Sequence, residues 1–139
     1  MKIHQYAILC APTPSQEAAT EALKEADTIA EEARATYRIR RDFLQRRLQE
    51  AGLPSVRPDG AFYLFVDVRG TGLSSREFAL QLLEEEKVAV VPGDAFGPGG
   101  EGFVRCSYAT SLERLEAAAD RIAKFTARRS ARQPVAATR

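Results

Sequence analysis

Hydrophobic and polar positions follow two different rhythms along the chain, one helical and one extended. From Ala19 to Leu48, apolar residues return every three or four positions, as on one side of a helix, until a Gly-Leu-Pro sequence at 52–54 ends the pattern. The spacing predicts a helical span of more than thirty residues with an interruption near Asp27. A helix of this length generally bridges separate bodies or lies along a large partner.

A Ser or Thr followed three residues later by Gln or Glu occurs at 13–16, 74–77 and 110–113. In such a capping box the hydroxyl accepts a hydrogen bond from a backbone N–H of the first turn, and the third residue's side chain bonds back to the cap. We therefore expect three helix starts. The apolar stripes that follow the second and third starts predict two amphipathic helices that cover a sheet.

Three short runs rich in aromatic or β-branched residues, 61–67, 87–91 and 103–108, predict strands. The last two runs follow each other without a helix between them. This order favours a two-layer α+β fold, a small mixed or antiparallel sheet of about three strands covered by helices, over a fully parallel sheet. Large apolar side chains are nearly absent after Phe125, so we expect a disordered tail over residues 128–139.

Composition narrows the classes of protein. The 139 residues fit one domain with an extension, and 20 Lys and Arg balance 19 Asp and Glu, so the chain lacks the one-signed charge of a nucleic-acid interface. The apolar runs are far shorter than the roughly 20 residues that cross a bilayer. Two cysteines, Cys10 and Cys106, and a single histidine indicate neither a disulfide framework nor a zinc site. We predict a reduced, cytoplasmic protein without nucleic-acid, membrane or metal partners.

Arg105, in the middle of the last predicted strand, is the most informative single residue. Alternation along a strand places it on one face together with Phe103 and Ser107. A guanidinium on a rigid strand can bind a carboxylate through two parallel hydrogen bonds. An arginine on a sheet surface can equally pair with a neighbouring glutamate, so the pattern alone leaves both interpretations open.

The segment 92–102 between the last two strands has five glycines in eleven positions. It lacks the G-K-[ST] sequence of a nucleotide P-loop, and no helix opens directly from it. Such a segment can be a flexible connection. An aromatic ring in an exposed glycine-rich loop usually covers something, however, so Phe96 is a candidate binding residue.

Five blocks of sequence carry a family resemblance when they are taken in order. They are KIHQYAILCAPTPSQEAATEAL at 2–23, Arg41-Asp42, PDGAFY at 58–63, LLEEEKVAVVPGDAFG at 82–97 and EGFVRCSYATS at 101–111. Together they resemble the C-terminal portion of class I and II pyridoxal-phosphate-dependent aminotransferases of fold type I, in the aspartate and aromatic aminotransferase branch. The resemblance runs over about residues 1–127 without a large gap.

The resemblance implies a division of the chain into three parts. Residues 1–26 would pack on a large domain, residues 27–127 would form the small domain with its long linker helix, and the tail would follow. The parent enzyme would be a homodimer that uses pyridoxal 5′-phosphate to transfer an amino group between an amino acid and a 2-oxo acid.

The resemblance also implies roles for single residues. Arg105 would bind the substrate α-carboxylate, and Phe96 would lie in a loop that borders the active site. In this family the cofactor-binding residues and the lysine that binds the cofactor covalently come from sequence before this portion. We therefore expect no catalytic, cofactor-binding or metal-binding residue in this chain, and no activity of the chain alone.

Two other functions stay open. The chain could be the aminotransferase-like, ligand-sensing half of a transcription regulator, in which the same arginine binds a ligand. It could also be a scaffold or partner-binding domain that has kept the fold without the chemistry.

Overall fold

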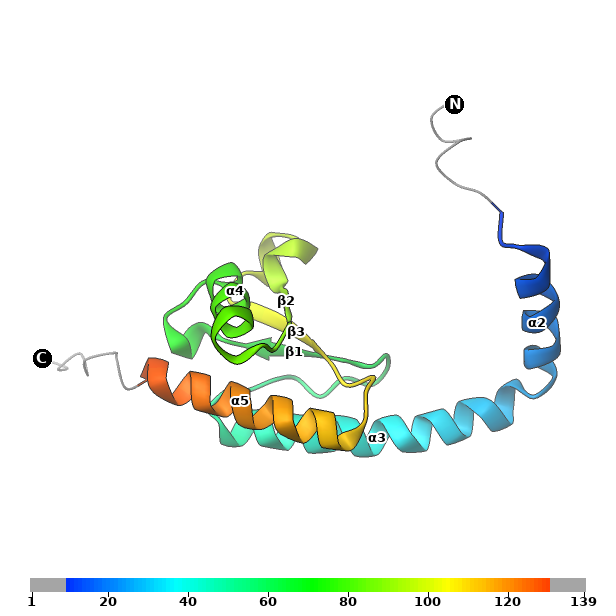
Figure 1. The fold of residues 1–139 in the computed structure, drawn as a ribbon, viewed down its shortest axis with the longest axis horizontal. Coiled ribbons are helices and arrows are strands. Elements are labelled where there is room, and N and C mark those ends of the chain that lie inside the picture. The colour runs from blue at the N-terminus through cyan, green and yellow to red at the C-terminus, as the bar shows by residue number, and fades with distance from the viewer. Residues whose placement is uncertain (1–9, 131–139) are drawn as a thin grey trace, which may run out of the picture. The chain divides into compact units, whose positions relative to one another are not determined.

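Two successive helices, α2 (Thr13–Lys24) and α3 (Ala26–Glu50), begin the described part of the chain (Figure 1). The computed structural model describes residues 10–130, and the chain divides into two units, Met1–Ala35 and Thr36–Arg139, so that α3 belongs to both. The backbone leaves helical geometry at Glu25 (φ −113°, ψ 17°), close to the interruption predicted near Asp27. Residues 10–35 contain no buried side chain.

Helix α3 ends at the predicted Gly-Leu-Pro stop. Gly52 takes the left-handed conformation with φ 79°, its N–H donates to the carbonyl of Gln49 (3.0 Å), and the N–H of Leu53 donates to the carbonyl of Leu48 (2.9 Å). These two bonds form a Schellman motif, which satisfies carbonyls that the helix end leaves unpaired. The turn directs Leu53 into the core, where it is buried.

The sheet of the second unit has three antiparallel strands, β1 (Tyr63–Asp67), β2 (Val91–Pro92) and β3 (Phe103–Ser107), in the order β1-β3-β2. This arrangement confirms the predicted two-layer α+β class with a small antiparallel sheet. Strand β2 is much shorter than the predicted run 87–91. Lys87 instead closes helix α4 (Ser75–Glu86) in a left-handed conformation (φ 57°), and pairing with β3 begins only at Val91, opposite Arg105.

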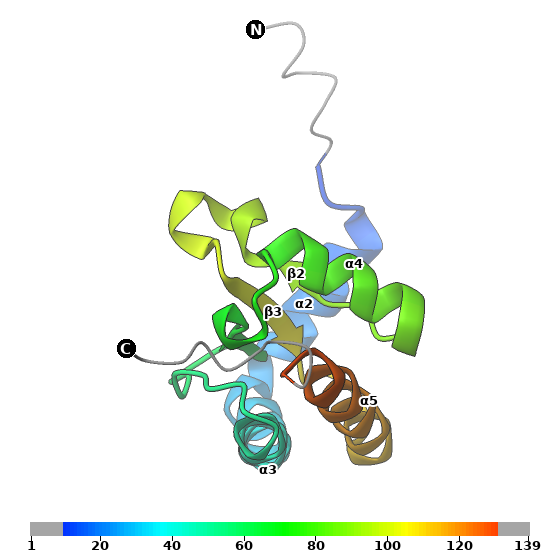
Figure 2. The same ribbon diagram turned by 90° about the vertical axis from the view of Figure 1, so that its left-hand side faces the viewer.

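Three helices pack on one face of this sheet: the C-terminal half of α3, α4 (Ser75–Glu86) and α5 (Leu112–Ser130). Figures 1 and 2 both show α5 running beside the C-terminal half of α3, and an ion pair between Arg47 and Asp120 joins the two helices. The core contains side chains from the sheet and from all three helices: Leu44, Leu48, Leu64, Val66, Phe78, Leu82, Val104, Cys106, Leu115, Ile122 and Phe125.

The three predicted helix starts differ in outcome. Ser74 and Glu77 form the capping box as predicted. Thr13 is itself the first helical residue of α2 and makes no cap, because Pro14 is tolerated only in a first turn and the helix therefore begins before it. In α5 the cap falls one residue later than predicted, at Ser111, whose hydroxyl accepts a hydrogen bond from the N–H of Arg114 (3.4 Å).

Helix α5 extends into the expected tail. Arg128 is helical and donates to the carboxylates of Glu85 (2.9 Å) and Glu86 (2.6 Å) on α4, and Arg129 pairs with Glu85 as well. The hydrogen bond from Arg128 holds the pKa of the Glu86 carboxyl below its ordinary value. These ion pairs continue the α4–α5 contact, so residues 128–130 belong to the helix; residues 131–139 lie outside the described part. None of the described helices is long and apolar enough to span a membrane.

Candidate functional site

The face of the sheet that points away from the helices carries the candidate site. Alternation along the paired strands β1 and β3 sends Leu64 and Cys106 into the core, and it leaves their neighbours Tyr63, Phe65 and Arg105 on the opposite face. Arg105 lies on the central strand, directly opposite Phe65 of β1 and Val91 of β2. The sequence-predicted arginine is therefore held on a strand that is paired on both sides.

Two aromatic rings contact the Arg105 guanidinium. Its central carbon lies 4.2 Å from the ring centroid of Tyr63 and 4.7 Å from that of Phe96. Both distances are short for a cation–π contact, which is attractive within about 6 Å. The structure thus brings the two sequence-predicted site residues, Arg105 and Phe96, together and adds Tyr63.

Arg105 makes no ion pair with any acidic side chain among residues 10–130. Arg69, by contrast, lies 5.2 Å from the ring centroid of Phe103 and also donates to the Asp67 carboxylate, with Nε–Oδ1 at 3.0 Å. This bond raises the pKa of Arg69 and lowers that of Asp67. In the described part of the chain, the alternative that a neighbouring acid occupies the Arg105 guanidinium is therefore not observed.

The glycine-rich segment that carries Phe96 is folded into two 3₁₀ turns, Gly93–Phe96 and Pro98–Gly100. Their backbones touch at the base of the loop, where a Cβ built on Gly100 would lie 2.0 Å from the carbonyl oxygen of Gly93. Glycine is required there for this close approach. At the other end of the loop, the Phe96 side chain is 53% exposed and meets the ring of Phe65 edge to face at 6.3 Å.

Ser75, the first residue of α4, holds the C-terminal end of this loop by hydrogen bonds. Its fully buried hydroxyl accepts hydrogen bonds from the N–H groups of Gly102 (2.8 Å) and Phe103 (3.1 Å) and donates to the carbonyl of Gly100 (3.3 Å). The backbone N–H of Ser75 donates to the carboxylate of Glu101 (2.9 Å). Four hydrogen bonds therefore join one residue of α4 to the end of the loop.

Two more contacts hold the segment that precedes β1. The Tyr108 hydroxyl donates to the carbonyl of Ala61 (3.0 Å), and Arg41 donates to the carbonyl of Pro58 (3.3 Å). Ala61 has φ 59°, a conformation that a residue with a side chain seldom adopts without support from its surroundings. Burial raises the pKa of Tyr108, which keeps its hydroxyl protonated as a donor. This support fixes the chain immediately before Tyr63.

Sequence reasoning missed Tyr63 and Ser75. In the sequence, Tyr63 is one of several aromatic residues of a predicted strand. Its contact with Arg105 follows from the β1–β3 register, which no local sequence pattern specifies. Ser75 follows the predicted cap Ser74 directly. A second serine at that place was the only signal, and it does not distinguish an exposed hydroxyl from one that anchors a distant loop.

A family model described as "Aminotransferase class I and II" matches residues 2–122. The chain belongs to this family. The resemblance seen in the sequence is therefore confirmed, and family membership implies pyridoxal phosphate as the cofactor of a full-length enzyme.

Individual aminotransferases align along most of the chain. It is 48% identical over 126 residues to aromatic-amino-acid aminotransferase 2 of Thermococcus litoralis, which covers 89% of the chain and 32% of that protein. The solved aromatic aminotransferase from Pyrococcus horikoshii superposes with a TM-score of 0.82 at 47% identity, over 92% of this chain and 35% of that one. Aspartate aminotransferase of Thermus thermophilus, solved with maleate, gives a TM-score of 0.70 at 44% identity, over 77% and 28%. The chain thus spans about a third of the length of the aminotransferases it matches.

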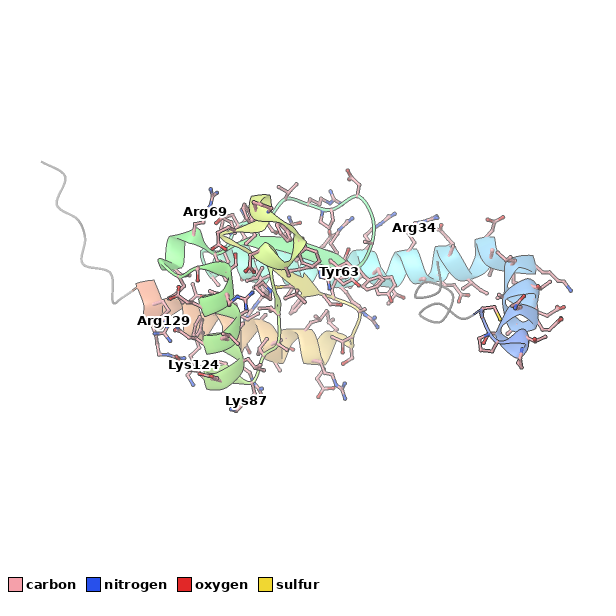
Figure 3. All side chains as sticks on the ribbon, turned by 90° about the horizontal axis from the view of Figure 1, so that it is seen from above. Arg34, Tyr63, Arg69, Lys87, Lys124 and Arg129 are labelled. Carbon is pink, nitrogen blue, oxygen red and sulfur yellow. The ribbon has the colours of Figure 1, made fainter. Side chains whose placement is uncertain are left out.

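The lysine side chains of the described part make other contacts or lie at a distance from Tyr63. Lys87 donates to a backbone carbonyl of its own helix, that of Glu84 (2.8 Å), and Figure 3 shows Lys87 and Lys124 well away from Tyr63. Lys24 pairs with Glu21 within α2 (2.7 Å), and Lys2 lies outside the described part. No group of three or more possible metal ligands occurs among residues 10–130. What the described site offers chemically is a cation for an anionic group.

Proposed function

We propose that this chain is the C-terminal, small-domain part of a pyridoxal-phosphate-dependent aminotransferase and that Arg105 binds the α-carboxylate of the substrate. The observation that carries the proposal is the Arg105 guanidinium on the open face of a central strand, in contact with two rings and with no acid partner in the described chain. The Thermus thermophilus relative solved with maleate, a dicarboxylate, supports a ligand of this chemical class.

The role of Arg105 in this proposal is orientation. A guanidinium donates two parallel, charge-assisted hydrogen bonds to a carboxylate and so fixes the plane of the carboxylate as well as its position. Because the reacting Cα is bonded to that carboxylate, its direction is then fixed relative to the rest of the enzyme, which turns binding energy into geometry. Phe96 borders the same place and excludes water from one side of the guanidinium.

We further propose that the complete protein is a cytoplasmic homodimer whose large domain holds the cofactor. This enzyme would transfer an amino group between an amino acid and a 2-oxo acid. We propose that the chain alone is inactive, because in this family the lysine that binds the cofactor covalently comes from sequence before the third that this chain matches. Pyridoxal phosphate mixed with the chain should then give no specific, stoichiometric visible absorption band.

Steady-state kinetics of the complete enzyme test the role of Arg105. We expect Arg105→Ala to lower kcat/KM by roughly two to four decades, which corresponds to about 3 to 5 kcal/mol of transition-state binding. Arg105→Lys should restore only part of the loss, because an ammonium group cannot form the two-pronged contact. A loss in Arg105→Ala smaller than about threefold would contradict the assignment. A complete protein that binds carboxylates at Arg105 but transfers no amino group would instead be the ligand-sensing alternative.

A further inference from the structure

An arginine without an acid partner needs some other contact to keep its side chain in one orientation. Free rotation about the side-chain bonds of arginine is worth up to about 2 kcal/mol of entropy, which binding has to overcome when the side chain becomes ordered. Among residues 10–130, Arg105 has no ion pair on its open face. The contacts observed for its guanidinium are the rings of Tyr63 and Phe96.

Ring contacts suit an arginine that must stay ready to bind an anion. A cation–π contact uses the flat side of the guanidinium, whereas hydrogen bonds to a carboxylate use the N–H groups along its edge. An acidic neighbour would occupy that edge, as Asp67 does at Arg69. Aromatic neighbours can thus hold the group without competing with a ligand.

The two rings reach Arg105 by different routes. Tyr63 belongs to β1, so the sheet register itself places it. Phe96 comes from the loop beyond β2, and its position depends on how that loop is held. The hydrogen bonds of buried Ser75 and the backbone contact of Gly93 with Gly100 fix the base of the loop.

We propose that Phe96 is a positioning residue for Arg105: the loop anchored at Ser75 holds the Phe96 ring against the guanidinium, which keeps the edge of the guanidinium turned toward an incoming carboxylate. The proposal rests on the proposed function of Arg105, and it adds that the glycine-rich loop orders the arginine before any ligand arrives. Ser75 then acts on the site from a distance, through the loop and through Phe96.

Nuclear magnetic resonance of the 139-residue chain tests this proposal, with maleate as the probe and the uncharged maleamide as control. The Nε–Hε signal of Arg105, identified by its loss in Arg105→Ala, reports the neighbouring rings through their ring currents. We expect Phe96→Leu to move this signal in the ligand-free chain and to weaken maleate binding by roughly two- to fivefold, as loss of one exposed cation–π contact predicts. Phe96→Tyr keeps a ring in place and should preserve both the signal and the affinity.

A second pair of variants tests the anchor. Ser75→Ala takes the hydroxyl acceptor from the buried N–H of Gly102 and the half-buried N–H of Phe103. The loop should therefore shift, and the Arg105 signal should move in the same direction as in Phe96→Leu. Thr126→Val is the matched control, because it removes another buried hydroxyl, which bonds to the carbonyl of Ile122 within α5. That change should leave the Arg105 signal in place. If Ser75→Ala fails to fold, the exposed Phe96 variant still decides the matter.

The possible results separate this proposal from the proposed function. If the complete enzyme binds maleate equally well with and without Arg105→Ala, the carboxylate-binding role of Arg105 is overturned. If Arg105→Ala weakens maleate binding to the complete enzyme but Phe96→Leu leaves the Arg105 signal of the ligand-free chain unchanged, only the positioning role of Phe96 is overturned.

Discussion

The two faces of the three-stranded sheet are built from the same strands and have opposite character. On the inner face, Leu64, Val66, Val104 and Cys106 pack against three helices in a continuous core. On the outer face, Phe65 is 37% exposed and lies beside Arg105. Strand alternation thus lets one residue pack in the core while the next residue along the strand stays accessible on the opposite face. Substitutions on one face should leave the property carried by the other face nearly unchanged.

The largest expected difference in the free energy of unfolding is between two single substitutions, one on each face of the sheet. Leu64 is fully buried, so Leu64→Ala should lower the free energy of unfolding by about 2–5 kcal/mol through lost burial and the cavity left behind. Arg105→Ala removes ring contacts at an open face and should cost less than about 1 kcal/mol. Urea unfolding of both variants measures the difference. Equal losses would show that the outer face also carries the fold.

The loop beside the outer face allows a comparison of two adjacent glycines. A Cβ on Gly100 would collide with the Gly93 backbone, whereas a Cβ on Gly99 meets nothing within 4 Å. We expect Gly100→Ala to destabilise the chain by about 1–3 kcal/mol and to displace Phe96, and Gly99→Ala to be nearly neutral. Urea unfolding together with the Arg105 Nε–Hε signal reports both effects. A neutral Gly100→Ala would mean that the base of the loop is not tightly held.

Helix α4 packs on the inner face of the sheet, and its first residue, Ser75, anchors the loop beside the outer face. Ser74→Ala removes the capping box and should cost about 1 kcal/mol. Thr13 offers the matched control, because it has the same sequence signature but makes no cap, and Thr13→Ala should change the free energy of unfolding by less than about 0.5 kcal/mol. Thermal or urea unfolding measures both. A substantial loss in Thr13→Ala would indicate that the first predicted cap forms after all.

The cysteines test how well the inner face excludes water. Burial raises the pKa of the Cys106 thiol to about 12, whereas Cys10 is exposed. At pH 8 a thiol reagent should therefore modify one cysteine per native chain and both in urea. Because the native state holds the Cys106 proton more tightly than the unfolded chain does, the free energy of unfolding should decrease as the pH rises above about 9. Rapid modification of both thiols in the native chain would contradict a closed inner face.

Local patterns sufficed to predict the elements and the face on which Arg105 lies, because helix and strand periods are properties of neighbouring residues. The predictions that failed concerned contacts between residues far apart in the sequence, or the choice among neighbouring residues of the one that caps a helix. The run 87–91 has strand-forming side chains, yet only its last residue, Val91, pairs with β3, followed by Pro92 beyond the run. The contact of Tyr63 with Arg105 and the bonds of Ser75 to Gly102 join residues 42 and 27 positions apart, respectively, and no spacing rule connects them.

A crystal structure of the complete enzyme with bound maleate would show which group receives the carboxylate. We expect one maleate carboxylate on the outer face of the sheet, with two oxygens about 2.7–2.9 Å from two Arg105 nitrogens and the Phe96 ring still beside the guanidinium. A carboxylate bound elsewhere, with Arg105 paired to an acidic side chain of the enzyme, would contradict this expectation.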